Sequence, residues 1–130
     1  MILPMRRLKL LVATRSETDR DLLRAFLKPS DYLLVFAMSA KEALDTLLFN
    51  PGFDLVLADV SLALPSGIGI SGAIRKFNPY IPLIGITAYP PDWVLKQNGG
   101  SGVDHWLMKP FSRQDLETAV WKLLTRVVSA

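Results

Sequence analysis

The sequence predicts a doubly wound α/β fold, in which a five-stranded parallel sheet carries helices on both faces. Five short apolar runs alternate with segments of helical periodicity, so the chain contains five strand–helix units. The apolar runs are nearly continuous, which is typical of parallel strands that are buried on both faces. No linker or repeat interrupts the 130 residues, so we expect one domain over residues 1–130 with its core at about 8–128.

The strands are predicted where apolar residues run together between turn-forming residues. They are LKLLVAT (8–14), YLLVFA (32–37), FDLVLAD (53–59), IPLIGIT (81–87) and VDHWLM (103–108). The third strand ends in Asp59, although burying an ionised carboxylate is costly unless it is paired or stays near water. Sites in open α/β sheets form beyond the carboxyl ends of the strands. Asp59 is therefore either the partner of a cation or a reactive group at that edge.

Apolar stripes and capping signals place the helices. The first stripe consists of Leu22, Leu23, Phe26 and Leu27 and ends at Lys28-Pro29. Ser39 and Glu42 form a capping box that begins the second helix, which stops before an Asn-Pro-Gly turn. Glycine and proline weaken the helical signal of the third and fourth segments, 67–78 and 91–98. Ser112 begins the last helix, whose apolar residues are Leu116, Ala119, Val120, Leu123, Leu124 and Val127.

Composition excludes several classes of protein. The net charge is +3 and the pI about 9.4, but lysine and arginine are scattered and no zinc-ligand spacing occurs, so we expect no nucleic-acid binding by this domain. No apolar run approaches the roughly 20 residues that cross a bilayer, and the N-terminal stretch lacks a signal-peptide cleavage site. The absence of cysteine fits a reducing compartment. We therefore expect a cytoplasmic protein that does not bind membranes.

Polar residues end four of the predicted strands: Thr14-Arg15, Asp59, Thr87 and Lys109. In these residues the sequence resembles the receiver domain of two-component response regulators, from Leu8 to about Val128. The motifs that carry the resemblance are DLVLADVSLALPSG, ITAY and GVDHWLMKPF, in this order. The resemblance implies a flavodoxin-like sheet of strand order 2-1-3-4-5 and a signalling domain of the bacterial cytosol rather than an enzyme.

The resemblance also assigns roles to single residues. It implies that Asp59 is the phosphoacceptor, that Thr87 and Lys109 contact the phosphoryl group, and that Trp106 occupies the aromatic switch position. It further implies a cis bond before Pro110 and a backbone carbonyl ligand at Ser61. The chemistry is consistent, because an aspartate can attack phosphorus while a lysine and a hydroxyl stabilise the phosphoryl oxygens.

The family places two acidic residues at the end of the first strand, where they help to hold Mg²⁺. The corresponding residues here are Thr14 and Arg15. A unit charge about 5 Å from a dication costs roughly 6–7 kcal/mol at an effective dielectric constant near 20. We therefore expect a degenerate Mg²⁺ site, no bound metal and no other cofactor. Arg15 is predicted to pair with Asp59 in place of the metal, and the alternative is that it points to solvent.

These residues predict an atypical receiver that has impaired Mg²⁺-dependent phosphorylation and acts through protein–protein interaction. The expected partner is a sensor histidine kinase or another signalling protein, with a homodimer through the last helix as a further expectation. The interacting face is expected on the fourth helix, the fifth strand and the last helix, with Trp93 and Trp121 as candidate interface residues. The alternative is a conventional response regulator that is phosphorylated on Asp59.

A flavodoxin-like protein that binds FMN is a less favoured alternative. The segment TRSETD (14–19) offers three hydroxyls for a flavin phosphate, but it lacks glycine, and Glu17 and Asp19 would repel the phosphate. The glycine-rich GIGISG (67–72) does not follow the first strand, as a dinucleotide-binding turn must. The single histidine, His105, has no partner at metal-ligand spacing.

Overall fold

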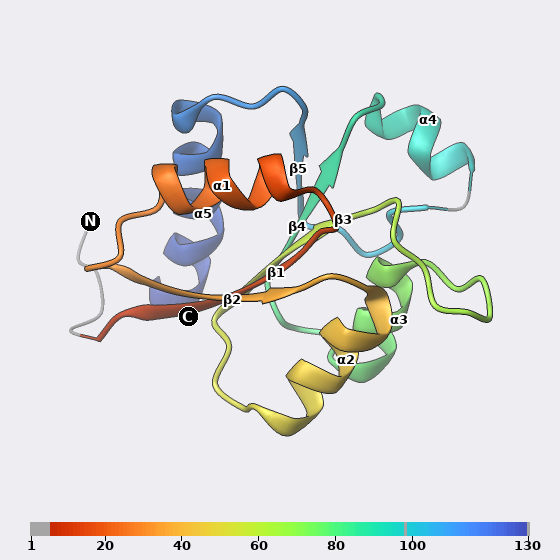
Figure 1. Ribbon diagram of the computed structural model, residues 1–130, viewed down its shortest axis with the longest axis horizontal. Coiled ribbons are helices and arrows are strands. Elements are labelled where there is room, and N and C mark those ends of the chain that lie inside the picture. Colours follow the sequence, from red (N-terminus) through yellow and green to blue (C-terminus); the bar gives the residue numbers. More distant parts are fainter. Residues whose placement is uncertain (1–5, 98, 130) are drawn as a thin grey trace.

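The computed structural model describes residues 6–97 and 99–129, with side chains up to Thr125. Its centre is a parallel sheet of five strands in the order β2-β1-β3-β4-β5 (Figure 1). The strands are β1 (Leu8–Ala13), β2 (Tyr32–Ala37), β3 (Leu55–Asp59), β4 (Leu83–Thr87) and β5 (His105–Met108). The predicted fold class and strand order are both confirmed, and each predicted strand differs from the observed one by at most two residues at either end.

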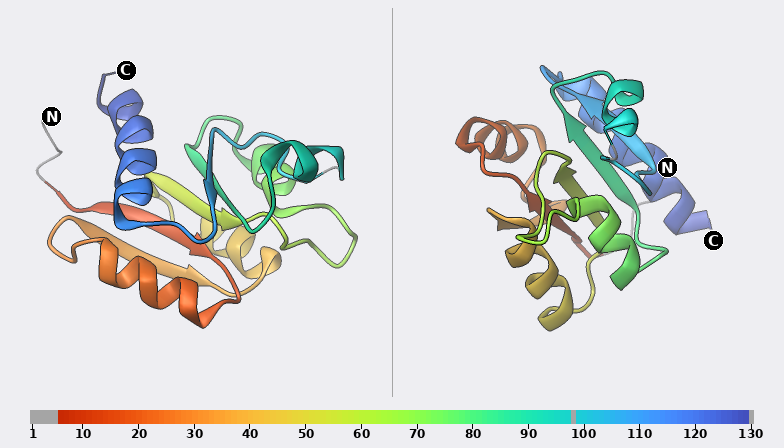
Figure 2. Two further views of the ribbon diagram at one scale, coloured as in Figure 1. Left: turned by 90° about the horizontal axis from the view of Figure 1, so that it is seen from above. Right: turned by 90° about the vertical axis from the view of Figure 1, so that its right-hand side faces the viewer.

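The helices lie on both faces of the sheet. They are α1 (Glu17–Phe26), α2 (Ala40–Phe49), α3 (Ile70–Phe77), α4 (Pro91–Lys96) and α5 (Arg113–Ser129). Figures 1 and 2 show α1 and α5 on one face and α2 and α3 on the other, with α4 following β4 at the carboxyl edge. No helix in the described part of the chain is both long and apolar enough to cross a membrane.

Alternate residues of each central strand enter different cores, which explains the nearly continuous apolar runs. On β1, Leu10 and Val12 pack with α1 and α5, whereas Leu11 and Ala13 pack with α2 and α3. All four side chains are completely buried. Because neither face of the central strands meets water, there is no selection for polar residues at alternate positions until the strand reaches the edge.

Serine side chains begin three of the helices. Ser39 Oγ accepts from the backbone N–H of Glu42 at 3.0 Å, as the sequence predicts, and Ser112 Oγ accepts from that of Asp115 at 3.0 Å. Ser16 Oγ accepts from the backbone N–H of Asp19 at 3.1 Å, so α1 begins at Glu17, well before its apolar stripe. The second half of the TRSETD segment is therefore the first turn of α1, which brings Asp19 to the sheet edge.

Arg75 on α3 fixes the loop that precedes β5. Its guanidinium donates to the carbonyls of Gly102 (2.8 Å) and Ile81 (2.6 Å) and pairs with Asp104 at 2.7 Å. Asp104 Oδ2 also accepts from the backbone N–H of Leu83 at 2.9 Å. These bonds hold the starts of β4 and β5 together. They thereby help to position Thr87 and Lys109, which lie at the opposite ends of these strands.

Candidate functional site

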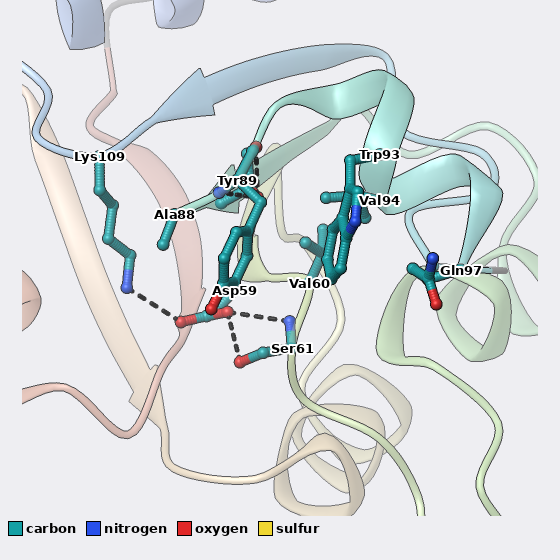
Figure 3. Close-up of a pocket in the computed structure, with 11 residues that line it drawn as sticks. Asp59, Val60, Ser61, Ala88, Tyr89, Trp93, Val94, Gln97 and Lys109 are labelled. Carbon is teal, nitrogen blue, oxygen red and sulfur yellow. Dashed lines mark hydrogen bonds and ion pairs between the residues drawn. The ribbon is translucent and has the colours of Figure 1, made fainter.

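The residues predicted for the site meet at the carboxyl edge of the sheet. Asp59 ends β3, Thr87 ends β4, and Lys109 follows β5 directly. The backbone N–H of Lys109 donates to the Thr87 carbonyl at 2.7 Å, which continues the β4–β5 pairing by one residue. Asp59, Thr87 and Lys109 line a pocket of about 420 Å³, whose other wall is formed by α4 and the loop before it (Figure 3).

Asp59 is stabilised by three contacts and still reaches solvent. Its Oδ1 accepts from the backbone N–H of Ser61 at 2.9 Å and from the Ser61 hydroxyl at 2.7 Å, and its Oδ2 lies 3.2 Å from Lys109 Nζ. The side chain is 13% exposed. A carboxylate can end this buried strand because a cation and two hydrogen-bond donors compensate for its partial desolvation.

A second carboxylate reaches the same lysine. Asp19, in the first turn of α1, lies with its Oδ2 2.8 Å from Lys109 Nζ, and the residue is only 6% exposed. The contact is an ion pair without the angles of a good hydrogen bond, and no other described side chain or backbone group hydrogen-bonds that oxygen. Partial burial lowers the pKa of Lys109, but Asp19 and Asp59 outweigh it and raise the pKa above its ordinary value.

Sequence reasoning missed this role of Asp19. In the sequence, Asp19 was considered only as a negative charge in TRSETD (14–19) that would repel a flavin phosphate. The signal that could have found it is the spacing of Ser16 and Asp19, which is that of a helix cap and a residue in the first helical turn. A helix that begins at Glu17 turns Asp19 towards the ends of the strands, where Lys109 lies.

The end of β1 carries no acidic group. Thr14 is completely buried, and its hydroxyl accepts from the backbone N–H of Ser16 at 3.0 Å. Arg15 is exposed, and among the described residues no ion pair joins it to Asp59. The predicted Arg15–Asp59 pair is therefore wrong, because the chain turns into α1 at this point and Lys109 already pairs with Asp59. The alternative, in which Arg15 points to solvent, agrees with the structure.

The groups at this edge do not fit a magnesium ion. Mg²⁺ requires oxygen ligands in a nearly octahedral arrangement. Here the Lys109 ammonium lies between the carboxylates of Asp19 and Asp59, and the Thr14 hydroxyl is used by the backbone of Ser16. Within residues 6–97 and 99–125, whose side chains are described, no group of three or more His, Cys, Asp or Glu is placed to hold a metal.

The hydroxyl of Thr87 hydrogen-bonds to the backbone of Tyr89 rather than to Asp59. It donates to the carbonyl of Tyr89 at 2.9 Å and accepts from the backbone N–H of Tyr89 at 3.0 Å. The residue is 2% exposed. The hydroxyl is therefore engaged by its own turn, and to donate to a group on Asp59 it would first have to give up its bond to the Tyr89 carbonyl.

Trp106 packs against the loop that follows α4. Gly100 adopts a φ of +73°, and a Cβ at this position would overlap the Cη2 and Cζ2 region of the indole. The loop therefore needs glycine here both for its backbone conformation and for the close approach of the ring. The peptide bond between Lys109 and Pro110 is cis, as the resemblance implied.

The tryptophans predicted for an interface do not line a common pocket. Trp93 on α4 packs against Tyr89, with ring centroids 4.8 Å apart, and both side chains line the pocket of Asp59 (Figure 3). Trp121 on α5 borders a separate pocket of about 370 Å³ with Tyr32, at the start of β2. They are 48% and 43% exposed. Both side chains are accessible to a partner, but the two residues border different pockets.

Comparisons with known proteins agree with this architecture. The family model described as "Response regulator receiver domain" matches residues 10–121. The sensor histidine kinase CheAY of Helicobacter pylori (strain ATCC 700392 / 26695) is 30% identical over 108 residues, which are 81% of this chain and 13% of that protein. The transcriptional regulatory protein ZraR of Escherichia coli (strain K12) is 32% identical over 108 residues, which are 83% of this chain and 24% of that protein. The chain thus spans about an eighth to a quarter of the length of these two relatives.

Solved structures show the same relationship. The signal receiver domain of an HD domain-containing protein from Pseudomonas fluorescens Pf-5 has a TM-score of 0.80 at 27% identity, over 99% of this chain and 95% of that chain. A response regulator receiver domain protein from Clostridium thermocellum has a TM-score of 0.76 at 26% identity, over 92% of this chain and 95% of that chain. The family match covers most of the residues whose geometry is described above. The chain belongs to the response regulator receiver domain family and is a receiver domain of two-component signal transduction.

Proposed function

We propose that this receiver signals through protein–protein interaction and that Mg²⁺-dependent phosphorylation of Asp59 is impaired. The observation that carries the proposal is the end of β1, where a buried threonine and an exposed arginine stand in place of two carboxylates. Phosphoryl transfer needs a cation that orients the incoming group and neutralises its developing charge. Without anionic ligands at β1, the pocket lacks the charge to hold such a cation.

The surroundings of Lys109 support the same proposal. In a phosphorylated receiver the lysine would neutralise part of the phosphoryl charge, which is nearly −2. Here the ammonium already lies within 3.2 Å of two carboxylate oxygens, one from Asp19 and one from Asp59. The Thr87 hydroxyl is likewise engaged, by the backbone of Tyr89. Both groups that would bind a phosphoryl oxygen therefore have partners that must be given up first.

The partner that this proposal requires is a sensor histidine kinase or another signalling protein. Trp93 and Tyr89 offer a half-exposed pair of contacting aromatic rings that lines the pocket of Asp59, which is the kind of group that anchors protein interfaces. Trp121 on α5 provides a separate exposed aromatic group, on which a homodimer through that helix would depend.

Phosphorylation is tested directly by intact-mass measurement. We expect little acyl phosphate after the protein is incubated with a small phosphodonor and Mg²⁺, because no carboxylate at β1 holds the metal. We also expect Asp59→Asn to bind the signalling partner as the wild type does. Substantial phosphorylation at Asp59, together with loss of partner binding in Asp59→Asn, would return the protein to the conventional phosphorylated response regulators.

The two exposed tryptophans are tested by single substitutions. We expect Trp93→Gln to weaken capture of the partner and Trp121→Gln to weaken self-association, because each removes an exposed aromatic anchor. Each should change the free energy of unfolding by less than about 1 kcal/mol. Tyr80→Gln is the matched control, since Tyr80 is an even more exposed aromatic residue outside both surfaces. A loss of several kcal/mol in Trp93→Gln or Trp121→Gln would place that residue in the core instead.

A further inference from the structure

We infer that Asp19 is a positioning residue that engages the Lys109 ammonium beside Asp59 and so keeps the pocket from binding anions. The inference deepens the proposed function, on which it rests for its biological meaning. It concerns a residue of α1, whereas the impaired metal site concerns the end of β1. It starts from the ion pair of 2.8 Å between Asp19 Oδ2 and Lys109 Nζ.

The buried carboxylate of Asp19 depends strongly on the Lys109 ammonium. The carboxylate is buried, with 8% of its side chain exposed, and its Oδ2 receives no hydrogen bond from any described group. A buried anion without donors is costly unless a cation lies beside it. Lys109 is that cation, so any event that draws the ammonium away leaves Asp19 Oδ2 buried and without a partner among the described residues.

The carboxylate of Asp59 depends less on the Lys109 ammonium. That carboxylate keeps two hydrogen bonds from Ser61, through the backbone N–H and the hydroxyl, when the lysine leaves. The Lys109–Asp59 distance is also longer, at 3.2 Å against 2.8 Å for Asp19. Only the contact with Asp59 has hydrogen-bond geometry, so the asymmetry lies in what each carboxylate would lose. Asp19 Oδ2 has no other donor, and withdrawal of the ammonium therefore costs Asp19 more than Asp59.

An anion that enters the pocket meets two obstacles because of Asp19. It must compete for an ammonium that another carboxylate needs, and it is repelled by that carboxylate across a few ångströms of partly desolvated protein. The pocket itself is large enough, at about 420 Å³, and it is lined by Ser61, whose N–H and hydroxyl both donate to Asp59 Oδ1 (Figure 3). Removing the charge of Asp19 should therefore turn an occupied lysine into an anion-binding group.

The test is the affinity for inorganic phosphate, measured in a metal-free buffer with a chelator. All proteins carry Asp59→Asn, which removes the acceptor carboxylate and makes acyl phosphate impossible. Binding is followed through the amide resonances of Ser61, Thr87 and Lys109. We expect Asp59→Asn/Asp19→Asn to bind phosphate at least about tenfold more tightly than Asp59→Asn alone, since loss of a nearby unit charge is worth at least one decade in affinity.

Matched variants separate this effect from a general change of charge. Asp21→Asn removes the same charge from the same helix, but Asp21 is exposed and pairs with Arg24, so the phosphate affinity should not change. Asp19→Glu keeps the anion and should also leave the affinity low. Adding Lys109→Gln to the Asp19→Asn protein should abolish the gain, because the gain depends on the released ammonium. Asp19→Leu replaces Asp19→Asn if thermal melting shows that the latter does not fold.

The inference is overturned if removing Asp19 changes the phosphate affinity by less than about twofold, or if Asp21→Asn raises it equally. It is also overturned if the gain survives Lys109→Gln. None of these results depends on whether the wild type is phosphorylated, because the Asp59→Asn proteins have no carboxylate to accept a phosphoryl group and no metal is present. Conversely, acyl phosphate on the wild-type protein would refute the proposed function and leave the role of Asp19 intact.

Discussion

The double substitution Thr14→Asp with Arg15→Asp is expected to create a Mg²⁺ site with a dissociation constant in the low millimolar range or tighter, whereas the wild type should show no saturable binding. The change supplies two carboxylates at the end of β1, the strand next to β3, and removes a cation, and hard oxygen anions are what Mg²⁺ requires. The new carboxylate at position 14 can still accept the backbone N–H of Ser16, as the threonine hydroxyl does at 3.0 Å. The helix start should therefore survive the substitution.

Binding can be followed by tryptophan fluorescence, by amide shifts near Asp59 and by thermal unfolding. A ligand that binds only the folded state raises the melting temperature by mass action, so Mg²⁺ should stabilise the double variant and leave the wild type unchanged. Arg15→Ala is the control, because it removes the positive charge without supplying a ligand. Saturable binding of Mg²⁺ to the wild type at low millimolar concentration or below would show that carboxylates at the end of β1 are not needed to bind the ion.

The sheet and its edge could be predicted from the sequence because their signals are local. Each central strand is an apolar run whose residues enter two cores alternately, and the polar residue that ends it is the first to reach the edge. Asp59, Thr87 and Lys109 are therefore found together simply because parallel strands end on one side. The caps Ser39 and Ser112 could also be predicted, since a helix cap depends only on neighbours within four residues.

The partners of these groups could not be predicted in the same way. Arg15 was expected beside Asp59 because of its position at the end of β1, but the chain enters α1 two residues later and leaves the guanidinium exposed. The lysine at the edge then takes its second carboxylate from Asp19, which lies 90 residues earlier in the chain. The pairing of these charges depends on where α1 begins and on the direction of each side chain. Neither can be read from the composition of the chain.

The separation of Trp93 and Trp121 has a similar cause. Both were expected on one face because they fall in the same third of the sequence. The structure places Trp93 at the pocket of Asp59 and turns Trp121 towards Tyr32 at the start of β2, an edge strand reached early in the chain. The fold order, in which β2 lies at one end of the sheet and β5 at the other, is what separates them.

Lys109→Gln is expected to lower the free energy of unfolding by about 2–3 kcal/mol at neutral pH, which is somewhat less than for a completely buried pair because the lysine is partly exposed. The substitution leaves Asp19 and Asp59 close together without the cation between them, and Asp19 Oδ2 has no donor among the described residues to replace it. Urea denaturation measures the effect. Lys41→Gln is the matched control, because Lys41 forms an exposed pair with Asp45 on α2 and should contribute less than about 1 kcal/mol.

A second substitution and the pH dependence of the lost stability should identify its cause. Asp19→Asn added to Lys109→Gln should recover most of the stability, since the unpaired buried anion is then gone. Asp19 and Asp59 raise the pKa of Lys109 in the folded state, so its contribution is fully present below the unfolded pKa of about 10.4 and is lost as the pH rises through the folded pKa. The difference between wild type and Lys109→Gln should therefore be constant from pH 7 to about 9.5 and shrink only at higher pH. A difference below about 0.5 kcal/mol at pH 7, or one that Asp19→Asn does not recover, would show that the lysine is not what holds the two carboxylates at this edge.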